Sequence, residues 1–347
     1  MTDSFCRVRA WQPKDEVAWD CFVHAHASGT FFHLSAWQEV LWRAFGHRSH
    51  YLLAEGLDGK ILGILPLVRV RSRLFGDALI SSPFCVYGGI VSLGDGVRAA
   101  LEARACELAH QLGVDYLELR NQQPRREDWL RKDLYYTFRK PIDADPEKNL
   151  LAIPRKQRAE VRKGIRHGLM GRVDEDAGEA CYRVYSESVR NLGTPVFSRN
   201  YFRILQEVFG SRCEPLVITY AHEPVSAVLS FYFRDEVLPY YGGGTAQARA
   251  LGGTQFMYWE LMRLAANRGA RLFDFGRSKV GSGSFDFKKY YGFEPLPLFY
   301  EYHLVNSRQM PNLSPNNPKY QLFIKIWKHL PLSVSQRVGP WISKYLG

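Results

Sequence analysis

The most constraining feature of this sequence is a set of landmarks that occurs twice along the chain in the same order. Tyr-Gly-Gly stands at 87–89 and again 154 residues later at 241–243. Each copy precedes an expected helix that ends at a glycine, and a short strand with a central acid follows, Glu118 or Asp274, 156 residues apart. Such a repeat predicts a duplicated lobe. The alternative is that two unrelated α/β lobes share this succession of elements.

Hydrophobic periodicity supplies the elements between these landmarks. We expect a hairpin turning at Asp58-Gly59 in the first half, and an antiparallel meander over 216–241 in the second. The unit reads helix, meander, helix, strand, which differs from a doubly wound βαβ sheet. The predicted fold is α/β (α+β), with two tandem lobes similar to N-acetyltransferases, each a mixed, mostly antiparallel sheet with flanking helices. The predicted parts are lobes at 1–150 and 151–310, a basic linker helix at 154–168, and a basic aromatic tail at 311–347 that packs on the N-terminal lobe or a membrane.

The net charge of +11 is concentrated in two segments of this 347-residue chain. Residues 155–167 hold six Lys/Arg against one Glu, and residues 319–347 hold five Lys/Arg and no acid. Such surfaces predict anionic partners: phosphates, nucleic acid or an acidic membrane face. The first residues lack a signal-peptide core and apolar runs such as 61–68 are too short to span a membrane, so we expect a cytoplasmic protein. The six scattered cysteines predict no disulfide and no metal site.

The leading reaction centre is the strand end at 272–275 and the glycine loop after it. Asp274 lies between two phenylalanines and faces away from both. Its carboxylate orients or deprotonates a substrate amine, or else it pairs with Arg277 or Arg271. We expect Lys288 and Lys289, beside aromatic residues, to point in different directions and to hold an oxyanion or a phosphate, or else to be surface lysines. The predicted catalytic residues are Asp274, Arg277, Lys288 and Tyr241, and further substrate-binding residues are Tyr240, Ser278, Lys279, Phe287 and Lys289.

Two segments are candidates for binding phosphate. The loop with Arg249, Gly252, Gly253 and Thr254 is similar to the Gln/Arg-x-x-Gly-x-Gly/Ala loop of acyl-CoA-dependent acetyltransferases, where free N–H groups at a helix start bind the pyrophosphate. Thr254 departs from that pattern. The second segment would place a row of arginines on one helix face, as a phosphate clamp or as a solvated surface. These arginines are Arg155, Arg158, Arg162 and Arg166.

Four motifs resemble a known family: 192–197 (LGTPVF), 238–243 (LPYYGG), 256–260 (FMYWE) and the run 273–293. They resemble FemAB-related proteins associated with exosortase/PEP-CTERM gene systems, in the FemABX-like branch of the GNAT superfamily. The resemblance implies two GNAT-like lobes. Fem proteins transfer an amino acid from aminoacyl-tRNA to an amino group on a peptidoglycan precursor, and Phe287-Lys288 matches their Phe-Lys pair. The chain lacks the helical arm of some Fem proteins.

These observations predict an acyltransferase acting on an amino group of a cell-envelope or exopolysaccharide-related acceptor, with an acyl-CoA-like donor. The alternatives are Fem-type transfer from aminoacyl-tRNA and a non-catalytic assembly factor at the inner membrane. The expected partners are a phosphate-bearing or lipid-linked acceptor, tRNA as the alternative donor, an anionic inner membrane touched peripherally, and no DNA.

Overall fold

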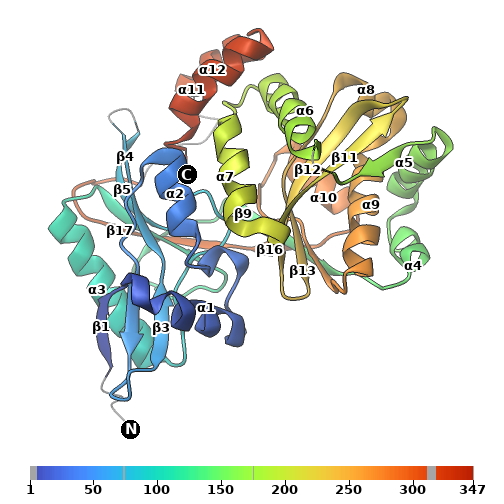
Figure 1. The fold of residues 1–347 in the computed structure, drawn as a ribbon. Coiled ribbons are helices and arrows are strands. Elements are labelled where there is room, and N and C mark those ends of the chain that lie inside the picture. The colour runs from blue at the N-terminus through green and yellow to red at the C-terminus, as the bar shows by residue number, and fades with distance from the viewer. Residues whose placement is uncertain (1–5, 73–74, 175, 311–317, 347) are drawn as a thin grey trace. The chain divides into compact units, whose positions relative to one another are not determined.

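The computed structural model describes residues 6–72, 75–174, 176–310 and 318–346, in two compact units (Figure 1). The first unit holds Met1–Tyr135, Pro297–Leu313 and Lys344–Gly347, and the second holds Tyr136–Leu296 and Ser314–Ser343. The predicted lobes were 1–150 and 151–310. The division in the structure differs, because residues 136–150 belong to the second unit and residues 297–310 belong to the first.

The first unit contains two sheets and a long helix that covers them. Gly113 ends that helix in the left-handed conformation, as predicted, and the Asp58-Gly59 turn joins two antiparallel strands. The sheets have the orders β1-β2-β3-β6 and β4-β5-β7-β17-β8, with β5 and β7 parallel. The elements are β1 Arg7–Ala10, α1 Glu16–Ala25, α2 Trp37–Phe45, β2 Leu52–Glu55, β3 Ile61–Leu65, β4 Leu67–Ser72, β5 Gly76–Ser81, β6 Val91–Ser92, α3 Asp95–Leu112, β7 Tyr116–Asn121, β8 Leu130–Lys132 and β17 Phe299–Leu304.

The second unit is built on one sheet of order β10-β11-β12-β13-β14-β9-β15, with β16 beside β9. β13 and β14 run parallel, and α9 between them in sequence packs its apolar face into the core under the sheet. The elements are β9 Tyr135–Pro141, α4 Pro146–Leu151, α5 Arg155–Arg166, β10 Met170–Arg172, α6 Ala177–Leu192, α7 Arg199–Phe209, β11 Cys213–Tyr220, β12 Glu223–Phe233, β13 Glu236–Gly244, α8 Ala246–Leu251, α9 Gly253–Asn267, β14 Leu272–Asp274, β15 Ser278–Lys279, α10 Gly283–Tyr290 and β16 Pro295–Pro297.

The repeat predicted from the sequence is visible as one parallel strand pair in each unit, with a long helix between its members: β5, α3, β7 and β13, α9, β14. The two Tyr-Gly-Gly landmarks differ in detail. Residues 241–243 lie inside β13, whereas 87–89 follow β5 in a loop. The fold is therefore a mixed α/β arrangement of two similar units, as expected.

The third strand of each repeat is exchanged along the chain. β17 comes from the far end of the sequence and lies beside β7 in the first unit, antiparallel over six residue pairs. β9 precedes the second half of the chain and lies beside β14 in the second unit. Strand pairing therefore spans most of the sequence, and the sequence carries no local signal for it.

The tail forms two helices, α11 Pro318–Lys328 and α12 Leu332–Ser343. Both belong to the second unit, where they contact α6. Gly193 at the end of α6 leaves room for Ile324 of α11. The end of the tail belongs to the first unit, where the Lys344 carbonyl oxygen lies 2.6 Å from His47 Nε2.

Glu301 on β17 gives a test of the exchanged strand. Its carboxylate is fully buried and accepts hydrogen bonds from Asn121 Nδ2 at 2.6 Å and from the N–H groups of Arg125 and Arg126 at 2.9 and 3.0 Å. Glu301→Gln turns an N–H group toward donors, so we expect the free energy of unfolding to fall by about 3 kcal/mol in a denaturant titration. The control is exposed Glu294→Gln, and an equal effect of the two substitutions would contradict this role for Glu301.

Candidate functional site

The candidate site lies in the second unit, where β13 and β14 stop running side by side. They are in register at Glu236 with Leu272 and at Val237 with Phe273, near the start of both strands. β14 then ends at Asp274, whereas β13 continues to Gly244 along β12. The turn after Asp274 and the second half of β13 therefore lie outside the parallel pairing of these two strands.

A β-bulge interrupts β13 shortly after its last residue pair with β14. Leu229 and Ser230 of β12 pair with Tyr241 and Pro239, so Tyr240 is the extra residue. A bulge redirects side chains and bends the strand. This bulge was not predicted, although a proline next to two tyrosines inside a strand is compatible with an irregular ladder.

Tyr241 is buried in an aromatic cluster between β13 and the helices α6 and α7. Its hydroxyl lies 2.8 Å from the hydroxyl of Tyr201, and its ring contacts Tyr185, Phe197 and Phe202. Burial raises the pKa of Tyr241 well above its ordinary value. The phenol is therefore protonated at neutral pH, which allows it to orient a group or donate a proton but not to act as a base.

Asp274 is fully buried and has a partner that was not expected. Its Oδ2 lies 3.2 Å from Nε of Arg139 on β9, and its Oδ1 accepts from the Gly276 N–H at 2.8 Å and from Thr137 Oγ1 at 3.4 Å. Arg139 also pairs with Glu236, whose pKa is raised by burial. The carboxylate therefore fixes the turn after β14.

Lys288 holds the same turn from the other side. It is buried, and Nζ donates to the carbonyl oxygens of Phe275, Gly276 and Arg277 at 2.7, 3.1 and 3.1 Å. In its charged form the amine has three N–H donors, and these carbonyls then use all of them. Burial lowers the pKa of Lys288 to about 7. Lys289 is exposed, which confirms that the two lysines point in different directions.

The remaining predicted substrate-binding residues surround this turn. Ser278 is buried, and within the described part of the chain its hydroxyl has no hydrogen-bond partner. Phe287 packs against Tyr258, Phe275 and Tyr291. Lys279 is half-buried, and its carbonyl accepts from Ser282 at 2.7 Å. The turn is thus bounded by aromatic rings and one unsatisfied hydroxyl.

The two predicted phosphate-binding segments lie against each other. Gly252 is left-handed (φ +69°) and directly precedes α9, and a Cβ there would meet the carbonyl oxygen of Glu160 on α5 at 2.4 Å. Gln255 donates to Gln157 across the same contact at 3.2 Å. Arg249 is exposed and Thr254 half-buried. The start of α9, with Gly253 as its first residue, therefore adjoins the cationic helix.

The arginine row on α5 is only partly available. Val161 and Gly164 are buried, and Gly164 leaves room for Phe256 of α9. Arg158 donates to the Leu151 carbonyl at 2.8 Å. The three exposed members of the row are Arg155, Arg162 and Arg166.

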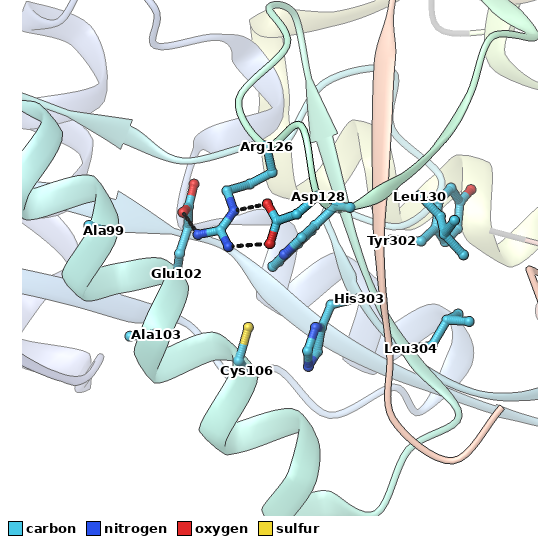
Figure 2. A pocket seen from close by; sticks show the side chains of 11 residues that line it. Ala99, Glu102, Ala103, Cys106, Arg126, Asp128, Leu130, Tyr302, His303 and Leu304 are labelled. Atoms are coloured by element: carbon cyan, nitrogen blue, oxygen red, sulfur yellow. Dashed lines mark hydrogen bonds and ion pairs between the residues drawn. The ribbon is translucent and has the colours of Figure 1, made fainter. Parts of the chain in front are cut away.

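A cavity of about 530 Å³ in the first unit was not predicted (Figure 2). Figure 2 shows Arg126 between Glu102 and Asp128, and burial raises the pKa of Glu102. Cys106 lies one turn along α3 from Glu102, and both residues line the cavity. Arg126 contacts both carboxylates of this cavity. Over the described ranges, no cluster of three or more His, Cys, Asp or Glu side chains forms a metal site.

The topology of both units and the helix placed between parallel strands define the GNAT-like fold. Residues 155–289 match the family described as "Acetyltransferase (GNAT) domain". No curated protein matches the chain.

Solved structures agree with this fold. FemX has a TM-score of 0.65 at 14% identity, covering 92% of this chain and 100% of FemX. A tandem GNAT protein from the clavulanic acid biosynthesis pathway has 0.54 at 12%, covering 88% and 100%. The C-terminal domain of a putative lysylphosphatidylglycerol synthetase from Agrobacterium fabrum has 0.51 at 13%, covering 83% and 91%. Over residues 6–72, 75–174, 176–310 and 318–346, no helix has the length and apolarity of a membrane span.

Proposed function

We propose that the second unit catalyses acyl transfer to an amino group, with an acyl-CoA-like donor and a cell-envelope or exopolysaccharide-related acceptor that bears phosphate or a lipid carrier. The observation that carries this proposal is the contact of the cationic helix α5 with the start of α9. Guanidinium groups and free N–H groups at a helix start both favour phosphate oxygens. The match of residues 155–289 to the acetyltransferase family supports the same reaction.

In this reaction the amine nitrogen attacks the acyl carbonyl carbon and a C–N bond forms. The C–S bond of a thioester, or the C–O bond of an ester, breaks, and the amine proton passes to the leaving group. Asp274 and Lys288 are positioning residues, since both hold the turn at 275–277. Arg277 stabilises the oxyanion or a phosphate. Tyr241, whose pKa is raised by burial, orients the amine or donates a proton.

The donor alternative is aminoacyl-tRNA, and it is favoured by the FemX-like fold together with the sequence resemblance. A third reading is an assembly factor without activity. If aminoacyl-tRNA is the donor, the arginines of α5 would bind the tRNA backbone instead of CoA phosphates.

The test is transfer by the purified chain from two donor sets, acyl-CoA esters and charged tRNAs, to an amine acceptor, followed by mass spectrometry of the product. We expect N-acylation from an acyl-CoA ester, reduced at least about 100-fold by Asp274→Asn, because the turn at 275–277 then loses its fixed geometry. Transfer from charged tRNA alone would replace the donor in this proposal. Absence of transfer from either set, by a protein that retains its fold, would reject the enzyme and favour the assembly factor.

A further inference from the structure

The two tail helices α11 and α12 combine exposed apolar side chains with positive charge. From residue 302 onward the sequence contains no acid. Single exposed apolar residues are ordinary on protein surfaces, but a contiguous group with one sign of charge marks an interaction surface. The acyl-transfer site described above does not use these helices.

The inner face of each helix is occupied. Trp327 of α11 is buried, and Ile324 lies where a Cβ on Gly193 would come within 2.5 Å of it. Arg190 of α6 donates to the Leu330 carbonyl at 3.0 Å between the two helices. Gly339 of α12 lies so close to Val196 that a Cβ would meet its backbone at 2.8 Å. The orientation of both helices on the second unit is therefore fixed.

The outer faces are apolar and basic at helical spacing. On α11, Leu322 and Ile326 are 66% and 58% exposed, with Lys325 between them. On α12, Val334 and Val338 flank Arg337, and Trp341 is 77% exposed one turn further on. We name the tail surface as the exposed side chains of Leu322, Lys325, Ile326, Lys328, Val334, Arg337, Val338 and Trp341.

The chemistry of this surface selects its occupant. A second copy of the same surface would bring like charges together, which opposes self-association. A bilayer with anionic phospholipids offers the headgroup charge for the lysines and arginine, and an apolar boundary for tryptophan and the aliphatic side chains. Helices of 11 and 12 residues are too short to span it and would lie in the interface.

We propose that the tail surface docks the protein on a membrane leaflet containing anionic phospholipids. This inference is independent of the acyl-transfer proposal, because neither donor nor acceptor is needed for docking. It would place an acceptor carried by a lipid within reach of the same surface.

The experiment is flotation of the full chain with vesicles of phosphatidylcholine alone and with vesicles that also contain phosphatidylglycerol, without donor or acceptor. We expect binding only to the mixed vesicles, weakened by added salt. One variant combines Val338→Ser with Trp341→Ser, and the other combines Lys325→Gln, Lys328→Gln and Arg337→Gln. Each should reduce binding at least about 10-fold, since each removes one of the two attractions.

Matched controls separate docking from general effects of charge and exposure. Leu57→Ser with Leu93→Ser removes two exposed apolar groups from the first unit, and Arg183→Gln, Arg199→Gln and Arg203→Gln remove three charges from α6 and α7. Both controls should bind as the parent does, and unfolding midpoints show that all variants are folded. The proposal would be overturned if the parent chain did not float, or if both tail variants bound as the parent does. An equal loss of binding in the controls, or a dimer that Trp341→Ser dissociates, would also overturn it.

Discussion

Replacing Lys288 by methionine is expected to lower the free energy of unfolding by about 3 kcal/mol and acyl transfer at least about 100-fold. Methionine keeps an unbranched apolar stem of nearly the same length but leaves three carbonyl oxygens, at residues 275–277, without their donor. Denaturant titration and a transfer assay measure the two effects. Lys289→Met is the stability control, because that lysine is exposed on the same helix. A Lys288→Met protein with parental stability and activity would refute the positioning role.

The pH dependence gives a second readout of Lys288. Its pKa in the folded chain is lowered to about 7 by burial, below its value of 10.5 in the unfolded chain. Between these values the unfolded chain binds a proton that the folded chain does not, so the contribution of this group to stability rises with pH. Relative to Lys288→Met, the unfolding free energy of the parent should therefore increase from pH 7 to 10. A flat difference would contradict the lowered pKa.

The second large effect is expected from removal of the exposed arginines on α5. Arg155→Gln, Arg162→Gln and Arg166→Gln together should raise the KM for an acyl-CoA donor about 100-fold, at about 1 kcal/mol for each lost phosphate contact, with little change in kcat. If the donor is charged tRNA, the same variant should reduce the salt dependence of binding by about one unit for each arginine.

The comparison for this variant is the equally charged set Arg183→Gln, Arg199→Gln and Arg203→Gln on α6 and α7. It has the same net charge, so a general loss of attraction for polyanions would appear in both proteins. An unchanged KM and an unchanged salt dependence in the α5 variant would remove α5 from donor binding and take the main support from the proposed function.

Local elements were predictable because each is specified by its own residues. Gly113 ends α3, and Asp58-Gly59 turns a hairpin, through backbone conformations that glycine adopts easily. The different directions of Lys288 and Lys289 also followed from their adjacency in the sequence. These features depend on a few neighbouring residues, so periodicity and turn chemistry suffice.

The parts that could not be predicted depend on long-range pairing. Asp274 was predicted to act on a substrate amine or, alternatively, to pair with Arg277 or Arg271. Its contact with Arg139, which β9 brings beside β14, was not predicted. The contacts of Lys288 with three backbone carbonyls were equally unpredictable, because backbone carbonyls leave no side-chain pattern in the sequence. α11 and α12 pack closely on the second unit because Gly193 and Gly339 carry no side chain at the contacts. The composition of the tail does not reveal these contacts.

The exchange of β9 and β17 also dictates an order of events during synthesis. The sheet of the first unit includes β17, so it stays incomplete until the ribosome has passed Leu304. Until then β7 has one unpaired edge, which is the kind of surface that recruits chaperones or aggregates. A stalled or truncated product would therefore expose this edge even if its first 135 residues were intact. The first unit therefore completes its sheet only after most of the second unit has been synthesised.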